Sequence, residues 1–164
     1  SGELTGMKIA YVEIDTLLAQ YNFCIDLNEG MVKKSENVRL TLNQKARELD
    51  KQKQDFQTKY QNNAYLSPER AQQEYNRIAK LEQDLQTLSN KLQSELMSEN
   101  EKNSLQLRDS INAFLKEYNK TKGYSMIISN TGFDNLLYAD SIYNITKEIV
   151  EGLNARYSSP APKK

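Results

Sequence analysis

The segment that decides the fold is GYSMIISNTGFDNLLYAD, residues 123–140. Its two apolar runs, YSMIISN (residues 124–130) and NLLYAD (residues 135–140), are typical of short strands, and the TGFD between them is typical of a turn. These strands follow residues 31–122, whose pattern is almost entirely helical. We therefore asked why a long, mostly polar helical hairpin ends in strands.

The first helix of this hairpin is predicted over residues 31–62, which contain neither Gly nor Pro. Leu42, Leu49 and Phe56 recur at seven-residue intervals, and polar residues occupy the alternate seam positions. The seam between the two helices is therefore thin. We expect the apolar residues to pack within the hairpin and the arm to bend.

A second helix is predicted from Pro68 to Lys122. Ser67 is a good N-cap, and Gly123 is a typical helix stop. At ~1.5 Å per residue this helix is roughly 80 Å long, which exceeds the diameter of a compact domain of this size. The sequence therefore predicts an antiparallel hairpin that protrudes from a body, with its turn near residues 62–68.

The body is predicted from the two ends of the chain. MKIAYVEI, residues 7–14, reads as a strand, and Asp15 as the N-cap of a short helix; Asn144 reads as the cap of a last helix. The apolar face of that last helix consists of Ile145, Ile149, Val150 and Leu153. The predicted division is a body of residues 7–30 and 107–157, a hairpin of residues 31–106, and flexible termini at residues 1–6 and 158–164.

The predicted fold class is α+β and predominantly helical, with three strands per chain in the body. So few strands and short helices lie near the lower size limit for a self-sufficient core. The strands are strongly apolar and leave open edges, so we expect neighbouring chains to share the sheet. The residues expected at this oligomerisation surface are Ile9, Tyr11, Val12, Ile127, Ile128, Leu136, Leu137 and Tyr138.

Composition excludes several functions. The 22 basic and 22 acidic residues cancel, which argues against a nucleic-acid partner. No apolar run approaches the ~20 residues of a membrane span. The chain has no His and no phosphate-binding loop or zinc pattern, so we expect no enzyme activity, cofactor or metal. Cys24, the single cysteine, is expected to be a small buried apolar residue.

Several tyrosines crowd the hairpin turn and have two interpretations. They could contact unfolded proteins, since Tyr buries area while tolerating water, or they could staple the end of the hairpin. Bases exceed acids eight to four in residues 31–62 although the whole chain is neutral, so a weakened electrostatic contribution to such binding remains. The candidate residues for binding unfolded proteins are Lys51, Lys53, Phe56, Lys59, Tyr60, Tyr65 and Tyr75.

Both ends of the chain resemble the Skp/OmpH-like periplasmic chaperones. KIAYVEIDTLLAQY (residues 8–21) resembles their opening strand and helix, and residues 123–154 resemble their closing signature, with Tyr-Ala-Asp at 138–140 and Asn-Ile-Thr at 144–146. The resemblance implies a homotrimer whose shared β-body carries three helical tentacles. These enclose unfolded outer-membrane β-barrel proteins without ATP. Well-known members are strongly basic, whereas this chain is neutral.

The resemblance also implies a periplasmic location, with a signal peptide removed from the chain. Two alternatives stay open. One is a coiled-coil structural or adaptor oligomer with no cavity for unfolded proteins. The other is a prefoldin-like chaperone, although the strand at residues 7–14 fits that class less well.

Overall fold

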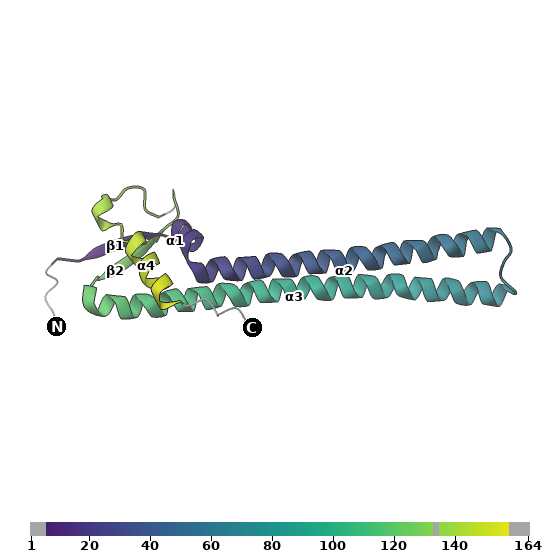
Figure 1. Cartoon of the computed structure of the whole chain (residues 1–164). Helices are drawn as coiled ribbons and strands as arrows, with labels where there is room; N and C mark the ends of the chain where they lie inside the picture. Colours follow the sequence, from purple (N-terminus) through teal and green to yellow (C-terminus); the bar gives the residue numbers. More distant parts are fainter. Residues whose placement is uncertain (1–5, 133–134, 158–164) are drawn as a thin grey trace. The chain divides into compact units, whose positions relative to one another are not determined.

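The structure is a computed structural model that describes residues 6–132 and 135–157. Its elements are β1 (Ile9–Glu13), α1 (Ile14–Gln20), α2 (Asn22–Gln61), α3 (Pro68–Lys122), β2 (Met126–Asn130), a 3-10 turn η1 (Ser141–Tyr143) and α4 (Thr146–Arg156) (Figure 1). This order confirms the predicted class, a predominantly helical α+β fold with a long helical hairpin and a small strand-containing body.

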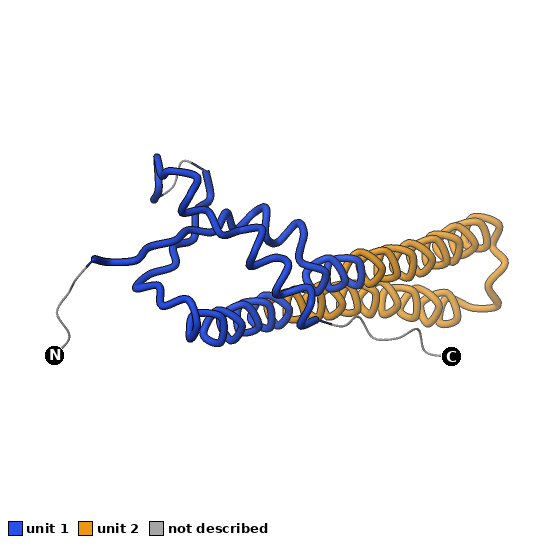
Figure 2. The backbone as a smooth tube through the Cα atoms, turned by 60° about the vertical axis from the view of Figure 1, so that its left-hand side comes forward, with its two compact units in different colours: residues 1–30, 102–164 blue, residues 31–101 orange. Residues whose placement is uncertain are grey.

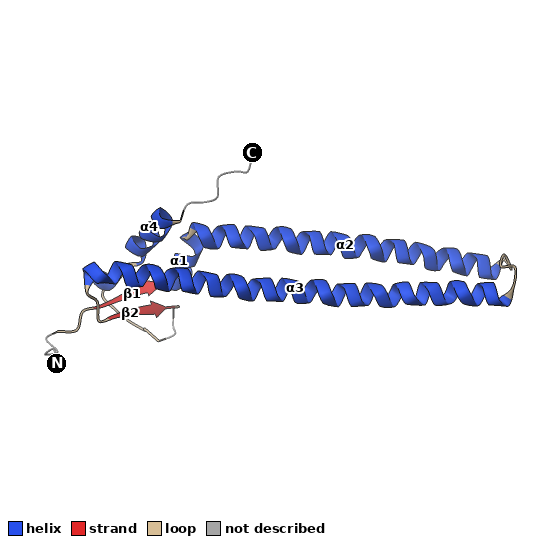
Figure 3. Cartoon of the chain, turned by 90° about the horizontal axis from the view of Figure 1, so that it is seen from below, coloured by secondary structure: helices blue, strands red, loops and turns tan. Residues whose placement is uncertain are grey.

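The chain divides into two compact units (Figure 2). Residues 1–30 and 102–164 form one, which we call the body unit, and residues 31–101 form the other, which we call the hairpin unit. In the described part of the chain, the strands lie in the body unit and the hairpin unit is built from helix and a connecting loop (Figure 3).

The sheet of the body unit has two parallel strands. β1 pairs with β2 in a register that sets Ile9 opposite Met126 and Glu13 opposite Asn130. The other edge of β1 meets the segment before α4, where Tyr11 bridges to Asn144. The N–H of the residue after Asn144 donates to the carbonyl of Tyr11 at 3.0 Å. Both edges of β1 are therefore occupied within one chain.

The prediction of a third strand over residues 135–140 is wrong. These residues form no strand, and the side chains of Leu137 and Tyr138 are 77% and 85% exposed. Part of the predicted turn, Phe133 and Asp134, lies outside the described residues. A strand needs a backbone partner as well as apolar side chains. β2 and the segment before α4 occupy both edges of β1, and residues 135–140 do not pair with the remaining edge of β2, so this apolar run forms no strand.

The core of the body unit lies where α1 and α4 pack near the sheet. Its largest fully buried side chains are Leu17, Tyr21, Ile149 and Leu153. The hydroxyl of Tyr21 is hydrogen-bonded to that of Ser110 at 2.8 Å, so the one polar group on these side chains is satisfied. The predicted apolar face of the last helix is confirmed, since all four of its residues are buried: Ile145, Ile149, Val150 and Leu153.

Local capping chemistry accounts for both ends of α3. α3 begins at Pro68 as predicted, with the hydroxyl of Ser67 accepting the N–H of Arg70 at 3.2 Å. It ends before Gly123, whose φ of +71° suits a glycine after a helix.

The prediction that Asn144 is the cap of the last helix is wrong by one position, because Ile145 is the N-cap and makes no side-chain capping bond. The side-chain oxygen of Asn144, one residue earlier, still accepts the N–H of Thr146 at 3.0 Å.

The start of α1 differs from the prediction. Glu13 is the N-cap residue and makes no side-chain capping bond, whereas Asp15 lies inside the first turn. The strand β1 runs directly into this helix, because Ile14 follows Glu13 without a loop. A carboxylate in the first turn is still favourable there, since it faces the positive end of the helix dipole.

The hairpin unit buries little apolar surface. Its buried apolar residues in the described chain are Leu49, Ala71 and Ile78, while Leu85 and Leu88 stay half-exposed. Ion pairs join the two helices, one of them between Lys34 and Glu99 and another, at 2.8 Å, between Lys53 and Glu82. The observed seam is thus as thin as the heptad pattern predicts.

Candidate functional site

Four aromatic residues gather at the end of the hairpin unit, and we call this cluster the aromatic tip: Phe56, Tyr60, Tyr65 and Tyr75. The ring of Phe56 lies 5.9, 5.7 and 6.2 Å from the rings of Tyr60, Tyr65 and Tyr75. Phe56 and Tyr65 are half-buried, whereas Tyr60 and Tyr75 are exposed over more than half of their surface. The cluster therefore both closes the hairpin and presents an aromatic surface.

A groove of about 400 Å³ opens beside these rings. It is lined by Phe56, Tyr60, Pro68, Ala71, Gln72 and Tyr75. Of the residues that α3 contributes, Tyr75 was predicted, whereas Pro68, Ala71 and Gln72 were not, although the spacing 68, 71, 72, 75 is that of one helix face. Leu66, in the loop that connects the two helices, is 93% exposed.

The charged residues of the tip are partly paired. Arg77 bonds Glu74 at 2.5 Å, and this bond holds the pKa of Glu74 below its usual value, with a smaller contribution from nearby Lys59. Desolvation raises the pKa of Tyr65, and the charge of Glu74 adds to that rise.

The three lysines predicted to bind unfolded proteins differ in their surroundings. Lys53 pairs with Glu82, and this hydrogen bond raises the pKa of Lys53. Lys51 and Lys59 are exposed. In sequence, Lys59 adjoins Tyr60 of the aromatic tip, whereas Lys51 lies more than one helical turn before Phe56.

Two further grooves flank the seam of the hairpin unit. They have volumes of about 200 and 410 Å³, and both are lined by Leu49 and Leu85. Charged residues border them, including Lys45 and Asp84 on one and Lys53 on the other. A two-helix seam cannot enclose its own leucines, so apolar atoms remain accessible on both flanks.

The residues predicted to join chains together fall into three classes in the body unit. Tyr11 and Val12 are buried within their own chain. Leu137 and Tyr138 are exposed. The remaining members are half-buried: Ile9, Ile127, Ile128 and Leu136. The single chain thus leaves part of this surface open to a partner and uses the rest for its own core.

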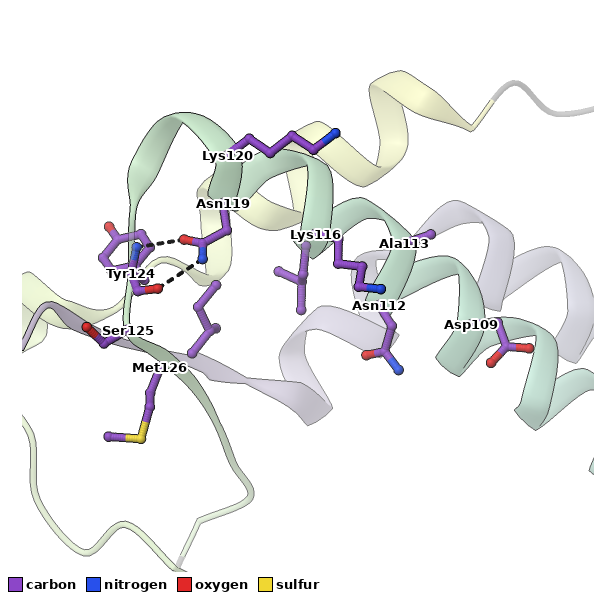
Figure 4. Close-up of a pocket in the computed structure, with 11 residues that line it drawn as sticks. Asp109, Asn112, Ala113, Lys116, Asn119, Lys120, Tyr124, Ser125 and Met126 are labelled. Atoms are coloured by element: carbon purple, nitrogen blue, oxygen red, sulfur yellow. Dashed lines mark hydrogen bonds between the residues drawn. The ribbon is translucent and has the colours of Figure 1, made fainter. Parts of the chain in front are cut away.

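A groove of about 850 Å³ runs between the last turns of α3 and β2 (Figure 4). The side-chain amide of Asn119 accepts the N–H of Tyr124 at 2.7 Å and donates to its carbonyl at 2.9 Å, which fixes the turn from α3 into β2. Lys116 and Lys120 line the groove from α3, and Met126 lines it from β2. Within the described residues β2 pairs with β1 alone, so its other edge has no strand beside it.

Comparison with known proteins identifies the family. Residues 8–153 match the model of the family described as outer membrane protein (OmpH-like). The chain belongs to the OmpH-like family. A solved structure of a candidate OmpH-like outer membrane chaperone from Caulobacter crescentus CB15 is similar in fold, with a TM-score of 0.82 at 12% sequence identity. The similarity covers 98% of this chain and 92% of that one. A search of curated proteins found no match.

Apolar side chains also cluster on the surface of the body unit of this OmpH-like chain. Met7, Ile142 and Tyr143 are exposed and line a groove of about 440 Å³ with the backbone around β1. Leu137 and Tyr138 are exposed as well, so several large apolar side chains of the body unit are uncovered in the single chain.

The described part of the OmpH-like chain contains no cluster of three or more residues suited to hold a metal ion. Among the helices of residues 6–132 and 135–157, none is long and apolar enough to cross a membrane. Cys24 is buried, and burial raises the pKa of its thiol, so a smaller fraction of it is the reactive thiolate.

Proposed function

We propose that this protein is an ATP-independent holdase chaperone of the periplasm that binds unfolded outer-membrane β-barrel proteins. In this proposal three chains share their body units, and the hairpin units serve as tentacles around a cavity. Membership of the OmpH-like family supports a chaperone role, and the fold likeness to a candidate outer membrane chaperone agrees with it.

The observation that carries the trimeric part of the proposal is the open edge of β2. This edge borders the groove of about 850 Å³, and the apolar residues of the body surface, including Leu137 and Tyr138, lie exposed in the single chain. An exposed strand edge and an uncovered apolar surface both favour association with another chain. A shared body would cover both.

The hairpin unit supports the binding of unfolded proteins through many weak contacts. Its half-exposed seam leucines and its aromatic tip offer apolar area, and its exposed lysines offer charge. Several weak contacts on one oligomer combine into a useful overall affinity, while each contact breaks quickly. Release by such a mechanism requires no nucleotide.

A dilution experiment tests the holdase activity. A urea-unfolded outer-membrane β-barrel protein is diluted into buffer with and without stoichiometric amounts of this protein, and light scattering follows aggregation. We expect suppression of the scattering signal. Unchanged aggregation would favour the alternative, a coiled-coil scaffold without a cavity for unfolded proteins.

A further inference from the structure

The end of the hairpin unit carries a projecting apolar side chain next to an open apolar groove. Leu66 is 93% exposed, so it leaves the groove of its own chain unfilled. The groove beside the aromatic tip has a volume of about 400 Å³, ample for one leucine side chain, and its walls are aromatic and aliphatic except for the polar side chain of Gln72. The tip thus presents a projecting side chain, Leu66, and a groove that this side chain does not fill in its own chain.

Charged residues of both signs adjoin, in sequence, the residues that line this groove. Lys59 and Arg70 are exposed, as are Asp55 and Glu69. None of the four forms an ion pair among the residues that the structure describes. A surface with equal numbers of acids and bases complements another copy of itself better than it complements a partner of one sign.

We propose that the hairpin tips of neighbouring protomers dock on one another, with Leu66 of each tip entering the aromatic groove of the next. This inference rests on the proposed homotrimer. Because projection and recess are different surfaces, the contact is head-to-tail, and such contacts close into a ring when the rotation fits the number of subunits. Three docked tips would close the space between the tentacles of an empty trimer.

The contact is weak enough to be reversible. Burial of one leucine side chain shifts an equilibrium by a factor of about ten to a hundred. That factor cannot hold separate molecules together, but it suffices when the shared body keeps the tips at a high effective concentration. An unfolded protein with apolar side chains competes for the same groove. The docked tips therefore act as a latch that an incoming unfolded protein opens.

Distances between the tips in solution test the latch. A spin label is attached at Asn62→Cys in a Cys24→Ala background, because Asn62 is exposed and does not line the groove. Pulsed electron paramagnetic resonance then measures label-to-label separations in the full-length protein. We expect a population of short separations, which Leu66→Asp reduces by about tenfold or more. Tyr75→Ala, which removes a groove wall, is expected to act in the same direction.

Two variants serve as matched controls. Tyr75→Phe keeps the ring and is expected to retain the short separations. Val32→Asp makes the same kind of change as Leu66→Asp, an exposed apolar residue to an acid, but at the opposite end of the hairpin unit. It is expected to leave the distances unchanged. Light scattering checks the mass of each variant.

Label-to-label separations that are only long, or that are the same with and without Leu66→Asp, would overturn the latch. If they are long while Leu66→Asp and Tyr75→Ala both weaken the capture of unfolded protein, the groove binds that protein rather than a neighbouring tip. If the protein is a trimer that suppresses aggregation, but Leu66→Asp does not change the separations between tips, then the latch is refuted and the proposed function stands. A monomeric mass refutes both the latch and the proposed trimer.

Discussion

The two units of this protein differ in how they use apolar residues. The body unit encloses a continuous buried cluster, in which Leu17, Ile149 and Leu153 are at most 1% exposed. The hairpin unit buries Leu49, Ala71 and Ile78, and its other seam leucines are partly accessible to water. Apolar burial therefore contributes more stability per residue in the body unit than in the hairpin unit. The body unit thus encloses its apolar side chains, whereas the hairpin unit leaves apolar atoms accessible to other molecules.

The largest effect is expected from Ile128→Asp in β2. In the proposed oligomer Ile128 lies in the shared apolar body, where an unpaired charge costs several kcal/mol, which is enough to dissociate the chains. Lys51→Asp, an equally drastic change in the hairpin unit, is expected to leave assembly intact. Light scattering compares both masses with the 18.9 kDa of one chain. Dissociation by Lys51→Asp but not by Ile128→Asp would mean that the hairpin unit is the oligomerisation surface.

A matched pair of leucines sharpens the contrast in burial. Leu153→Ala removes a side chain that is 1% exposed, and we expect a loss of about 2–5 kcal/mol in the free energy of unfolding. Leu88→Ala removes the same atoms from the half-exposed seam, so we expect a loss below about 1.5 kcal/mol. Urea unfolding followed by circular dichroism measures both. Equal losses would show that the hairpin seam is as well packed as the body core.

Two helical glycines are expected to respond with opposite signs when changed to alanine. A Cβ at Gly152 in α4 would lie 2.3 Å from the ring of Phe114 on α3, so Gly152→Ala is expected to destabilise by about 1–3 kcal/mol. A Cβ at Gly30 in α2 would meet no atom within 4 Å. Gly30→Ala is therefore expected to stabilise by about 0.5–1 kcal/mol, because alanine favours the helix. Stabilisation by both changes would mean that α4 packs less tightly than described.

The smallest effect concerns pH. Lys122 bonds Glu148 at 3.1 Å and, with Tyr118, lowers the pKa of Glu148 below its ordinary 4.5. A lowered folded-state pKa stabilises the protein above pH 4.5, and this contribution is lost as pH falls through the folded-state value. Glu148→Gln is expected to lose about 0.2–1 kcal/mol at pH 7, since the pair is half-exposed. Urea midpoints of parent and variant should converge once the pH falls below the folded-state pKa of Glu148, and a gap that persists throughout the acid range would contradict the ion-pair explanation.

Sequence alone determined the features that depend on neighbouring residues. The capping of α3 by Ser67, its end before Gly123, and the apolar face of the last helix all follow from contacts within a few positions along the chain. Periodicity likewise predicted the thin seam. The aromatic tip was foreseen from Tyr60, Tyr65 and Tyr75 because they lie close together in sequence.

Only the tertiary structure decided the features that depend on distant partners. The apolar run at residues 135–140 predicted a strand, but β1 pairs with β2 and with Asn144 instead, and that choice is made between segments more than a hundred residues apart. The groove of the tip likewise requires α3 to set Ala71 and Gln72 against Phe56 on α2. Helix signals are local and readable from the chain, whereas pairing and grooves depend on which backbone edges and side chains meet after folding.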